Sequence, residues 1–340
     1  MNKYNNLHCH TTNSDGKLTV QDTIQFCEKN SVEAVAFTDH DSVLKDSDIE
    51  YLKSYTGPVR WVSGIEISVG NIPEIDKKLS SLHMVGLFVD PTNKELKKFC
   101  KRAQDARRDR MQRIVKNLKS IDIYISEQDC LEASGGEAVG RPHIVEAIMK
   151  YPKNVERIEE LYKEMIDAAD SNEVAQEKVN IIEQQGDGQK PYMIFLSKDS
   201  YIPNIYVDYV FQPTWDECVK VIRDAGGLSF LAHYFSIAKK VELSFIEKLI
   251  KEGRLDGIEV VYGLYMNKVD SEYSKEFVKQ QEELLEISKR TGCYISGGSD
   301  AHNYENWEEF VNTPEFANRT VGLLDNILEK SEKGLSWYKS

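Results

Sequence analysis

The sequence lacks long hydrophobic runs. Of its 340 residues, 41% are hydrophobic and 29% are charged, and no apolar run approaches the ~20 residues that a membrane-spanning helix needs. Residues 1–6 contain no apolar stretch, so they do not resemble a signal peptide. This composition predicts a globular protein without a membrane segment, and we expect a cytoplasmic location.

Cysteine is sparse, and positive charge is in deficit. The six cysteines lie far apart without a Cys-x-x-Cys pair, which argues against a structural zinc knuckle or a disulfide framework and predicts reduced thiols. The formal net charge is -13. A protein of this charge repels a polyanion at long range, so duplex DNA is not an expected partner. The charge does not exclude small phosphorylated substrates or the short single-stranded ends of nucleic acids.

Short β-rich runs alternate with helical stretches at both ends of the chain. We predict strands at residues 7–10, 34–38, 59–67, 82–89, 228–232, 257–262 and 294–296. Thr19 and Thr214 each begin a capping-box pattern, which starts a helix. This alternation predicts parallel strands in a βα repeat, made of residues 1–92 and 213–340.

The pattern changes between residues 93 and 212, where long charged helical stretches replace the alternation. A Gln-Gln-Gly-Asp-Gly-Gln break at 184–189 precedes an aromatic segment at 192–211. We predict an inserted, mainly helical subdomain here. Its aromatic side chains are expected to form the subdomain's own core rather than to stack on a base.

Histidine is rare as well, and most of its seven copies stand beside acidic residues or at predicted strand ends. His8 and His10 are two residues apart on a strand, so both rings point to the same side. Asp300 and His302 repeat this spacing. Other polar residues at strand ends are Asp39, His40, Glu66 and His233. Strand ends converge on one face of a (β/α) barrel, which favours a barrel over an open sheet.

These residue types suit metal binding. Imidazole and carboxylate groups bind zinc, manganese or iron, and a carboxylate such as Glu66 can bridge two ions about 3.5–4 Å apart. Taken alone, His83 and His143 are more simply explained as hydrogen-bonded residues. Clustered ionisable groups cost desolvation energy and add little packing, so the set as a whole predicts a metal centre.

Short motifs follow one another along nearly the whole chain. They are His8-Cys9-His10-Thr11, Ser14-Asp15-Gly16, Thr38-Asp39-His40-Asp41, Gly64-Ile65-Glu66-Ile67-Ser68, His83-Met84-Val85-Gly86-Leu87, Ala232-His233 and Gly298-Ser299-Asp300-Ala301-His302. In this order they resemble the motifs of the PHP (polymerase and histidinol phosphatase) superfamily. The resemblance implies a distorted (β/α)7 barrel, a helical insertion that caps the site, and two or three divalent metal ions (Mn, Fe or Zn).

The resemblance also implies three groups of metal ligands. The first is His8, His10, Glu66 and Asp300; the second is Glu66, His83 and His233; the third is Asp15, His40 and His302. Glu66, Asp300 and His302 are the candidate catalytic residues. Asp39 is expected to orient His40 or a neighbouring ligand.

Within the superfamily, the chain resembles a branch of nucleoside 3',5'-bisphosphate phosphatases and 5'-to-3' exoribonucleases. The residues that would approach the substrate phosphate in that branch are Arg107, Arg110, Arg141 and His143. A solvated helix face is an equal alternative for the arginines near residue 110, because an apolar stripe runs beside them. The segment of residues 151–209 is longer than is usual in this branch. Three roles stay open for the extra length: a specificity lid, a surface elaboration or an oligomer contact.

The implied function is hydrolysis of a phosphate ester by a metal-activated hydroxide. The implied substrate is a nucleoside bisphosphate or a short 5'-phosphorylated oligoribonucleotide. Two alternatives stay open: a histidinol-phosphate-type phosphatase, which would lack the Gly140-Arg141-Pro142-His143 pattern, and a non-catalytic metal-binding PHP module. The sequence predicts no particular oligomeric state.

Overall fold

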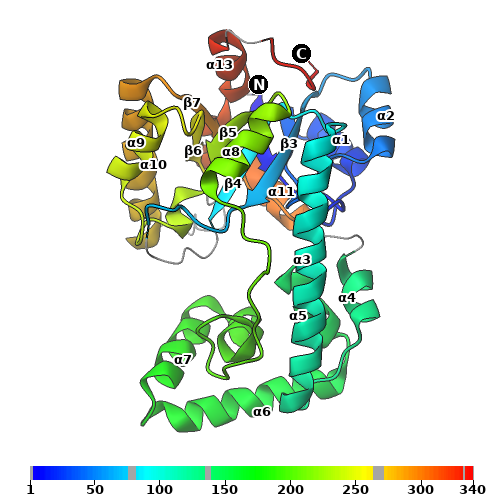
Figure 1. The fold of residues 1–340 in the computed structure, drawn as a ribbon, viewed down its shortest axis with the longest axis vertical. Coiled ribbons are helices and arrows are strands. Elements are labelled where there is room, and N and C mark those ends of the chain that lie inside the picture. Colours follow the sequence, from blue (N-terminus) through cyan, green and yellow to red (C-terminus); the bar gives the residue numbers. More distant parts are fainter. Residues whose placement is uncertain (1–2, 76–81, 135–138, 263–271, 332–333, 340) are drawn as a thin grey trace. The chain divides into compact units, whose positions relative to one another are not determined.

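The chain folds into two compact units. The structure, a computed structural model, describes residues 3–75, 82–134, 139–262, 272–331 and 334–339. One unit comprises residues 1–103 with 211–340, and the other comprises residues 104–210. The unbroken helix α3 (Lys94–Leu118) contains the boundary between them, whereas the sequence pattern placed this boundary at residue 93 (Figure 1).

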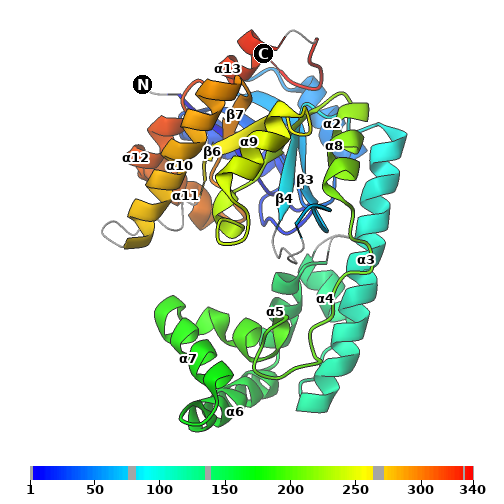
Figure 2. The ribbon, with the colours of Figure 1, turned by 60° about the vertical axis from the view of Figure 1, so that its left-hand side comes forward.

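The first unit is built on one curled sheet whose seven strands follow chain order (Figures 1 and 2). The strands are β1 (Tyr4–Cys9), β2 (Val32–Phe37), β3 (Arg60–Ser68), β4 (His83–Leu87), β5 (Leu228–Leu231), β6 (Gly257–Val261) and β7 (Tyr294–Gly297). Each of the strands predicted from the sequence is confirmed, with bounds that differ by a few residues at most.

The direction of one strand was predicted wrongly. We expected parallel strands, but β4 runs antiparallel to both β3 and β5, while the other neighbouring pairs are parallel. Antiparallel neighbours need no crossover helix between them. Because of this reversal, His83 at the start of β4 pairs with Ser68 at the end of β3. The first residue of β4 therefore lies where the parallel strands finish.

The segment after β7 closes the sheet against β1. The Asp300 N–H donates to the His8 carbonyl and the His10 N–H donates to the Ala301 carbonyl, each over 2.9 Å. A Cβ on Gly298 would lie 2.4 Å from the His8 backbone nitrogen, so only glycine permits this approach. The first unit is therefore the distorted (β/α)7 barrel that the resemblance implied.

Helices cover the outside of the sheet (Figure 2). Besides the first turns of α3, they are α1 (Val20–Lys29), α2 (Asp46–Ser54), α8 (Trp215–Asp224), α9 (Leu243–Lys251), α10 (Glu272–Thr291), α11 (Tyr304–Asn312), α12 (Pro314–Ala317) and α13 (Leu323–Lys330), with the short turns η4 (Tyr234–Ser236) and η6 (Asn318–Thr320). Thr19 and Thr214 close the predicted capping boxes of α1 and α8. Trp215 and Ile222 of α8 are fully buried, as expected for the inner face of an amphipathic helix.

The second unit is helical. After the rest of α3 come η1 (Lys119–Ile121), α4 (Glu127–Ser134), α5 (Arg141–Met149), α6 (Pro152–Ala169), α7 (Glu173–Gln185), η2 (Asp187–Gln189) and the π-helical turn η3 (Tyr192–Leu196). Gly186, with φ +96°, ends α7. Ile144, Leu161 and Phe195 belong to a buried apolar cluster that is separate from the clusters around the sheet. The second unit therefore has a hydrophobic core of its own.

The predicted aromatic segment is divided among three environments. Phe195 is fully buried in the core of the second unit, and Tyr192 packs at the edge of that core. Tyr206 and Tyr209 lie against arginine side chains instead, and Phe211 packs against the core of the first unit. The expectation that these aromatic residues form the insertion's own core was therefore right for Tyr192, Phe195 and Tyr201 and wrong for Tyr206, Tyr209 and Phe211.

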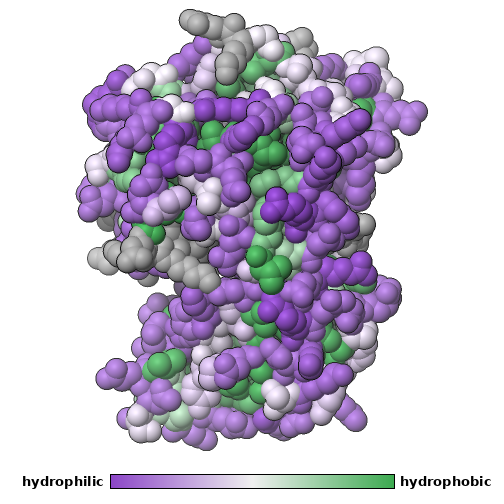
Figure 3. Space-filling view, in the orientation of Figure 1, coloured by the Kyte–Doolittle hydropathy of each residue, from purple (hydrophilic) through white to green (hydrophobic). Residues whose placement is uncertain are grey.

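The surface and the thiols agree with the composition. Within the described part of the chain, no helix is both long and apolar enough to cross a membrane. On the face drawn in Figure 3, hydrophilic side chains cover most of the surface and hydrophobic ones form small patches. All six cysteines are buried and free, which confirms the prediction of thiols without disulfides.

Candidate metal centre

All nine predicted metal ligands lie together where the barrel strands end. They are His8, His10, Asp15, His40, Glu66, His83, His233, Asp300 and His302. Three overlapping groups each place one ligand atom per residue within 4.8 Å of the others: His8, His10, Glu66 and Asp300; His10, Asp15, His40 and His302; and His40, Glu66 and His83. Residues from opposite ends of the chain meet here because β1 and the segment after β7 are neighbours in the closed barrel.

Glu66 of β3 occupies the middle of this centre and is fully buried. One carboxylate oxygen, Oε2, lies 2.9 Å from His40 Nδ1 and 3.3 Å from His10 Nε2. The other, Oε1, lies 2.8 Å from His83 Nδ1 and 3.0 Å from His233 Nε2. Because its two oxygens face different histidines, Glu66 has the arrangement expected of a carboxylate that bridges two ions.

The first group joins β1 to the segment after β7. His8 Nε2 lies 3.4 Å from both Glu66 Oε2 and Asp300 Oδ1, and His10 Nε2 lies 2.9 Å from Asp300 Oδ1. Asp300 has a left-handed backbone (φ +55°), which aspartate adopts more readily than most residues. Such backbone strain concentrates at functional sites.

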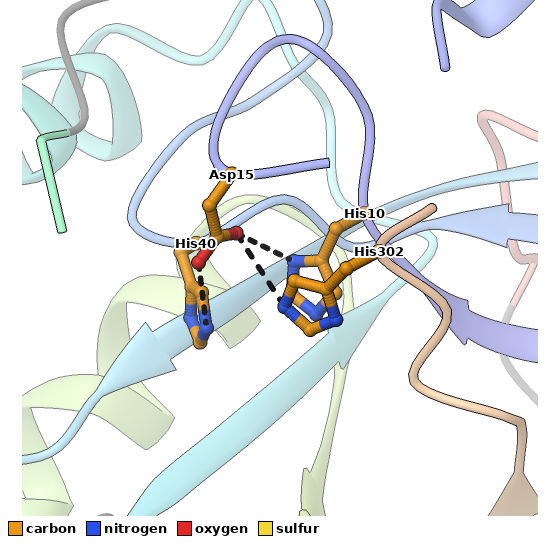
Figure 4. A group of neighbouring side chains, drawn as sticks. All are labelled: His10, Asp15, His40 and His302. Atoms are coloured by element: carbon orange, nitrogen blue, oxygen red, sulfur yellow. Dashed lines mark ion pairs between the residues drawn. The ribbon is translucent and has the colours of Figure 1, made fainter. Parts of the chain in front are cut away.

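The group around Asp15 contains His10, His40 and His302 (Figure 4). Asp15 Oδ1 lies 3.6 Å from both His10 Nδ1 and His302 Nε2, and Asp15 Oδ2 lies 3.9 Å from His40 Nε2. A Cβ on Gly16 would lie 2.4 Å from the His10 carbonyl, so glycine lets the loop with Asp15 approach the end of β1. The Nδ1 of His10 faces this group and its Nε2 faces the first group. A neutral imidazole has one free lone pair, so His10 can bind only one ion.

The group of His40, Glu66 and His83 differs from the one that the resemblance implied, which was Glu66 with His83 and His233. His40 lies near Glu66 and His83, although the resemblance assigned it only to the Asp15 group. The two nitrogens of His40 face Asp15 and Glu66. His233 was expected in the group with Glu66 and His83, and its Nε2 lies 3.2 Å from His83 Nδ1. His83 and His233 are therefore both within reach of a position beside Glu66 Oε1, and His40 lies beside Oε2.

Two buried nitrogens of the centre, His8 Nε2 and His10 Nδ1, have no hydrogen-bond partner among the residues that the structure describes. An unsatisfied buried polar group costs about 1–3 kcal/mol, so their concentration in one place is not explained by stability. Converging nitrogen and oxygen donors are the ligand set that Zn, Mn and Fe prefer. The residues present therefore fit divalent metal ions.

The electrostatics keep the carboxylates ionised. Burial raises the pKa of Glu66, but the neighbouring histidines, His40 first, hold it well below its usual range. The pKa of Asp300 is lowered in the same way, because burial is outweighed by His8 and other histidines. Burial lowers the pKa of His8, yet nearby carboxylates, Glu259 first, raise it well above its usual value. Glu66 and Asp300 are thus available as anionic ligands at neutral pH.

A buried acid that the sequence reasoning missed lies behind two of the histidines. Glu259 of β6 accepts hydrogen bonds from His8 Nδ1 over 2.8 Å and from the His233 main-chain N–H over 2.7 Å. Its side chain is fully buried. The signal that could have found it is a charged residue inside the apolar strand Gly257–Val261.

Asp39 does not contact His40, the residue that we first expected it to orient, in any hydrogen bond that the structure describes. It was expected to orient His40 or a neighbouring ligand, and its hydrogen bonds are with the loop that leads to Asp15. Asp39 accepts from the Thr11 N–H (2.8 Å), the Thr11 hydroxyl (2.8 Å) and the Ser14 hydroxyl (2.7 Å). Burial raises the pKa of Asp39, although these hydrogen bonds oppose the shift. The residue therefore fixes the backbone that presents Asp15.

The residues predicted to bind phosphate form a cluster inside the second unit. Arg107 and Arg110 of α3 are only 6% and 4% exposed, whereas Arg108 between them is exposed. The Arg110 guanidinium lies 4.1 Å from the ring centre of Tyr209 and donates to the Val207 carbonyl over 2.7 Å. Arg107 Nη1 lies 3.4 Å from the Tyr209 hydroxyl. The solvated-face alternative thus fits Arg108 but not Arg107 or Arg110.

Arg141 and His143 belong to the same cluster. The Arg141 and Arg110 guanidinium groups lie 6.0 Å and 4.9 Å from the ring centre of Tyr206. His143 is buried and accepts the Gly140 N–H at Nδ1 over 2.9 Å, which leaves its Nε2 able to donate. Burial lowers the pKa of Arg110, and the positive charge of Arg141 lowers it further. Converging guanidinium groups of this kind suit an anion.

A (β/α) barrel with a histidine and carboxylate centre at its strand ends has the architecture of a metal-dependent hydrolase. The sequence profile of the PHP domain matches residues 6–320. The chain belongs to the PHP domain family, and the family and this centre together make it a metal-dependent hydrolase.

Known relatives cover nearly the whole chain. A protein named 5'-3' exoribonuclease from Haemophilus influenzae is 22% identical over 98% of this chain and 100% of its own length. The 5'-3' exoribonuclease Rnm of Escherichia coli is 23% identical over 89% of this chain and 86% of its own.

Solved structures support the fold. One, described as a metal-dependent phosphoesterase from Bifidobacterium adolescentis, aligns over 98% of both chains with a TM-score of 0.63 and 22% identity. Another, described as an amidohydrolase from Chromobacterium violaceum with bound sulfate, aligns over 88% of this chain and 87% of its own, with a TM-score of 0.58 and 20% identity. At this level of identity the likeness establishes the fold alone.

Proposed function

We propose that this protein hydrolyses nucleotide phosphate esters in the cytoplasm, with a nucleoside bisphosphate or a short 5'-phosphorylated oligoribonucleotide as substrate. The observation that carries the proposal is the buried arginine cluster, which coexists with the histidine and carboxylate centre in a chain of net charge -13. Guanidinium groups bind phosphate oxygens in bidentate fashion. The two exoribonuclease-named relatives, alike over most of their length, favour an RNA or nucleotide substrate.

In this proposal the centre holds two or three divalent ions, Mn, Fe or Zn. The first would be bound by His8, His10, Glu66 and Asp300; the second by Glu66, His83 and His233; the third by Asp15, His40 and His302. When bound, such ions lower the pKa of water and neutralise phosphoryl oxygens. Assigning His10 to the first position uses its Nε2, which faces Asp300 at 2.9 Å.

The protein's own groups have distinct tasks in this mechanism. Arg107, Arg110 and Arg141 would bind a substrate phosphate, and His143 would add a hydrogen bond through Nε2. Proton transfer falls to Asp300 or His302. The side chain of His302 is 32% exposed and that of Asp300 is 18% exposed, so His302 exchanges protons with solvent more readily. Its Nδ1 lies 2.8 Å from the Asp300 carbonyl, which orients the ring.

A phosphate-release screen tests the substrate. The purified protein with added manganese would be given adenosine 3',5'-bisphosphate, a 5'-phosphorylated RNA of a few nucleotides and histidinol phosphate. We expect the first two to be hydrolysed with much higher kcat/KM than the third. Preference for histidinol phosphate would replace the proposal with the histidinol-phosphate-type alternative. No activity on p-nitrophenyl phosphate or its bis-ester, together with no bound metal, would support a non-catalytic module instead.

The arginine cluster gives a second test with a matched control. Arg141 is partly exposed, so Arg141→Ala removes a guanidinium with little loss of packing. We expect KM for the nucleotide to rise about ten-fold or more, because a hydrogen bond to a charged group contributes about 1.5–3 kcal/mol. Arg108→Ala removes an exposed arginine outside the cluster and should leave KM unchanged. Equal effects of the two variants would mean that the cluster does not bind the substrate.

A further inference from the structure

We infer that Glu259 is a positioning residue of the metal centre that orients two histidines at once, His8 through its ring and His233 through its main chain. The inference rests on the proposed metal-binding role of these histidines. It assigns a task to a residue that none of the family motifs above contains.

The carboxylate of Glu259 is buried and divided between two donors. Oε1 lies 2.8 Å from His8 Nδ1, and Oε2 accepts the His233 N–H over 2.7 Å. On the other side of its ring, His8 Nε2 lies 3.4 Å from both Glu66 Oε2 and Asp300 Oδ1. The His8 ring therefore has one nitrogen facing the support and the other facing the centre.

This hydrogen bond selects the tautomer of His8. With the proton on Nδ1, which faces Glu259, the lone pair is on Nε2, which has no hydrogen-bond partner among the described residues. A carboxylate behind a histidine also makes the ring a stronger donor to a metal. Glu259 thus supplies orientation, tautomer and basicity to one ligand of the first group.

The second hydrogen bond acts on the backbone. His233 follows β5 with φ +22° and ψ 68°, a conformation that is strained for a residue with a side chain. Its N–H is held by Glu259, while its Nε2 lies 3.0 Å from Glu66 Oε1 and 3.2 Å from His83 Nδ1. One carboxylate therefore links the first ligand group to the position beside Glu66 Oε1.

Glutamine cannot replace this carboxylate, although it has the same size. Both partners of Glu259 are donors: the His233 N–H always, and His8 Nδ1 whenever Nε2 binds a metal. An amide has one accepting oxygen and one donating NH2 group. In Glu259→Gln, one buried N–H must therefore face another donor, at a cost that the carboxylate avoids.

Asp256 offers a matched control from the segment just before the same strand. Its carboxylate accepts from the Ser229 N–H (2.9 Å), the Ser229 hydroxyl (2.7 Å) and Arg223 (2.8 Å). These contacts involve none of the nine predicted ligands. Asp256→Asn removes a largely buried carboxylate next to β6 and should affect stability without affecting metal binding.

The experiment measures metal retention rather than turnover. The full-length wild-type protein and the Glu259→Gln and Asp256→Asn variants would be loaded with zinc and dialysed against graded chelator, and bound metal would be quantified by mass spectrometry. We expect Glu259→Gln to lose metal at about 10- to 100-fold lower chelator concentration, and Asp256→Asn to match the wild type. A wild-type midpoint for Glu259→Gln, or an equal shift for Asp256→Asn, would overturn the inference.

Two further measurements exclude a merely structural effect. The thermal unfolding midpoint of the metal-free proteins should fall no more for Glu259→Gln than for Asp256→Asn; a larger fall would make Glu259 a stability residue. If Glu259→Gln does not fold, Glu259→Asp retains both oxygens on a shorter arm, and wild-type metal retention by it would overturn the inference. A wild-type protein that binds no metal would refute the proposed function itself, which keeps the two failures distinct.

Discussion

Glu66 is the residue on which most of the metal centre depends. Its two oxygens lie within 3.3 Å of nitrogens from His10, His40, His83 and His233. Loss of one such carboxylate would therefore affect several ligand groups at once, whereas loss of one histidine would affect fewer.

We predict that Glu66→Ala abolishes metal-dependent activity without unfolding the chain. The affinity for metal should fall by at least about 100-fold. Loss of a residue that only supports a ligand already lowers metal affinity about 10- to 100-fold. Metal analysis and circular dichroism measure the two properties separately. Glu247 of α9 is a half-buried glutamate outside the nine predicted ligands and paired with Arg290 and Lys251, and Glu247→Ala should retain both metal binding and the fold. Full turnover by metal-loaded Glu66→Ala would contradict the assignment.

At the scale of elements, Asp256 joins three of them. It precedes β6, accepts from Ser229 of β5 and pairs with Arg223 of α8. Burial raises the pKa of Asp256, but the hydrogen bonds from Arg223 and Ser229 outweigh burial and lower it below its usual value. A carboxyl group with a lowered folded pKa stabilises the protein above its unfolded pKa, about 3.9, and loses this effect as the pH falls through the folded value.

The loss of stability caused by removing this carboxylate should therefore depend on pH. Asp256→Asn should reduce the free energy of unfolding by about 1–3 kcal/mol at pH 7, because hydrogen bonds to a charged group are lost. The difference from the wild type should shrink well below pH 3.9, where Asp256 is protonated. Urea denaturation at pH 7 and at a pH well below about 3.9 measures this difference in the free energy of unfolding. Val219→Ala, a buried apolar change in α8, should cost the same at both, and a pH-independent loss for Asp256→Asn would contradict the argument.

At the scale of the whole molecule, the two units have separate hydrophobic cores, which predicts that each unit unfolds in a transition of its own. In the proposed function, metal would bind the folded barrel and not the unfolded chain, so it would stabilise the unit that holds it. The second unit has its own core around Phe195. Two cores need not unfold in a single cooperative transition.

We expect calorimetry to show that chelator lowers the unfolding temperature of the barrel and leaves that of the second unit unchanged. Phe195→Ala should have the reverse effect, because removing a buried phenylalanine costs about 3–5 kcal/mol in the unit that contains it. Phe230→Ala, in the barrel core, is the matched control and should destabilise the barrel. A single transition that moves with every perturbation would show that the units unfold together.

What the sequence determined by itself was the chemistry and the local periodicity. Histidines beside acids, the spacing of His8 and His10, the capping boxes at Thr19 and Thr214 and the β-rich runs are all local patterns, and each predicted feature of this kind lies where expected. Local patterns depend on side-chain direction and on hydrogen bonds within a few residues, so they are readable without the fold.

Only the tertiary structure decided which of these groups meet, and on which side. The direction of β4 depends on pairing between distant segments, and this pairing sets where His83 lies. Arg107 and Arg110 are buried while Arg108 is exposed because of what packs against α3. Glu259 resembled any acid in the sequence, and its contact with His8 arises because β6 and β1 lie on the same closed barrel. Long-range packing determines such contacts, and local sequence carries no direct record of it.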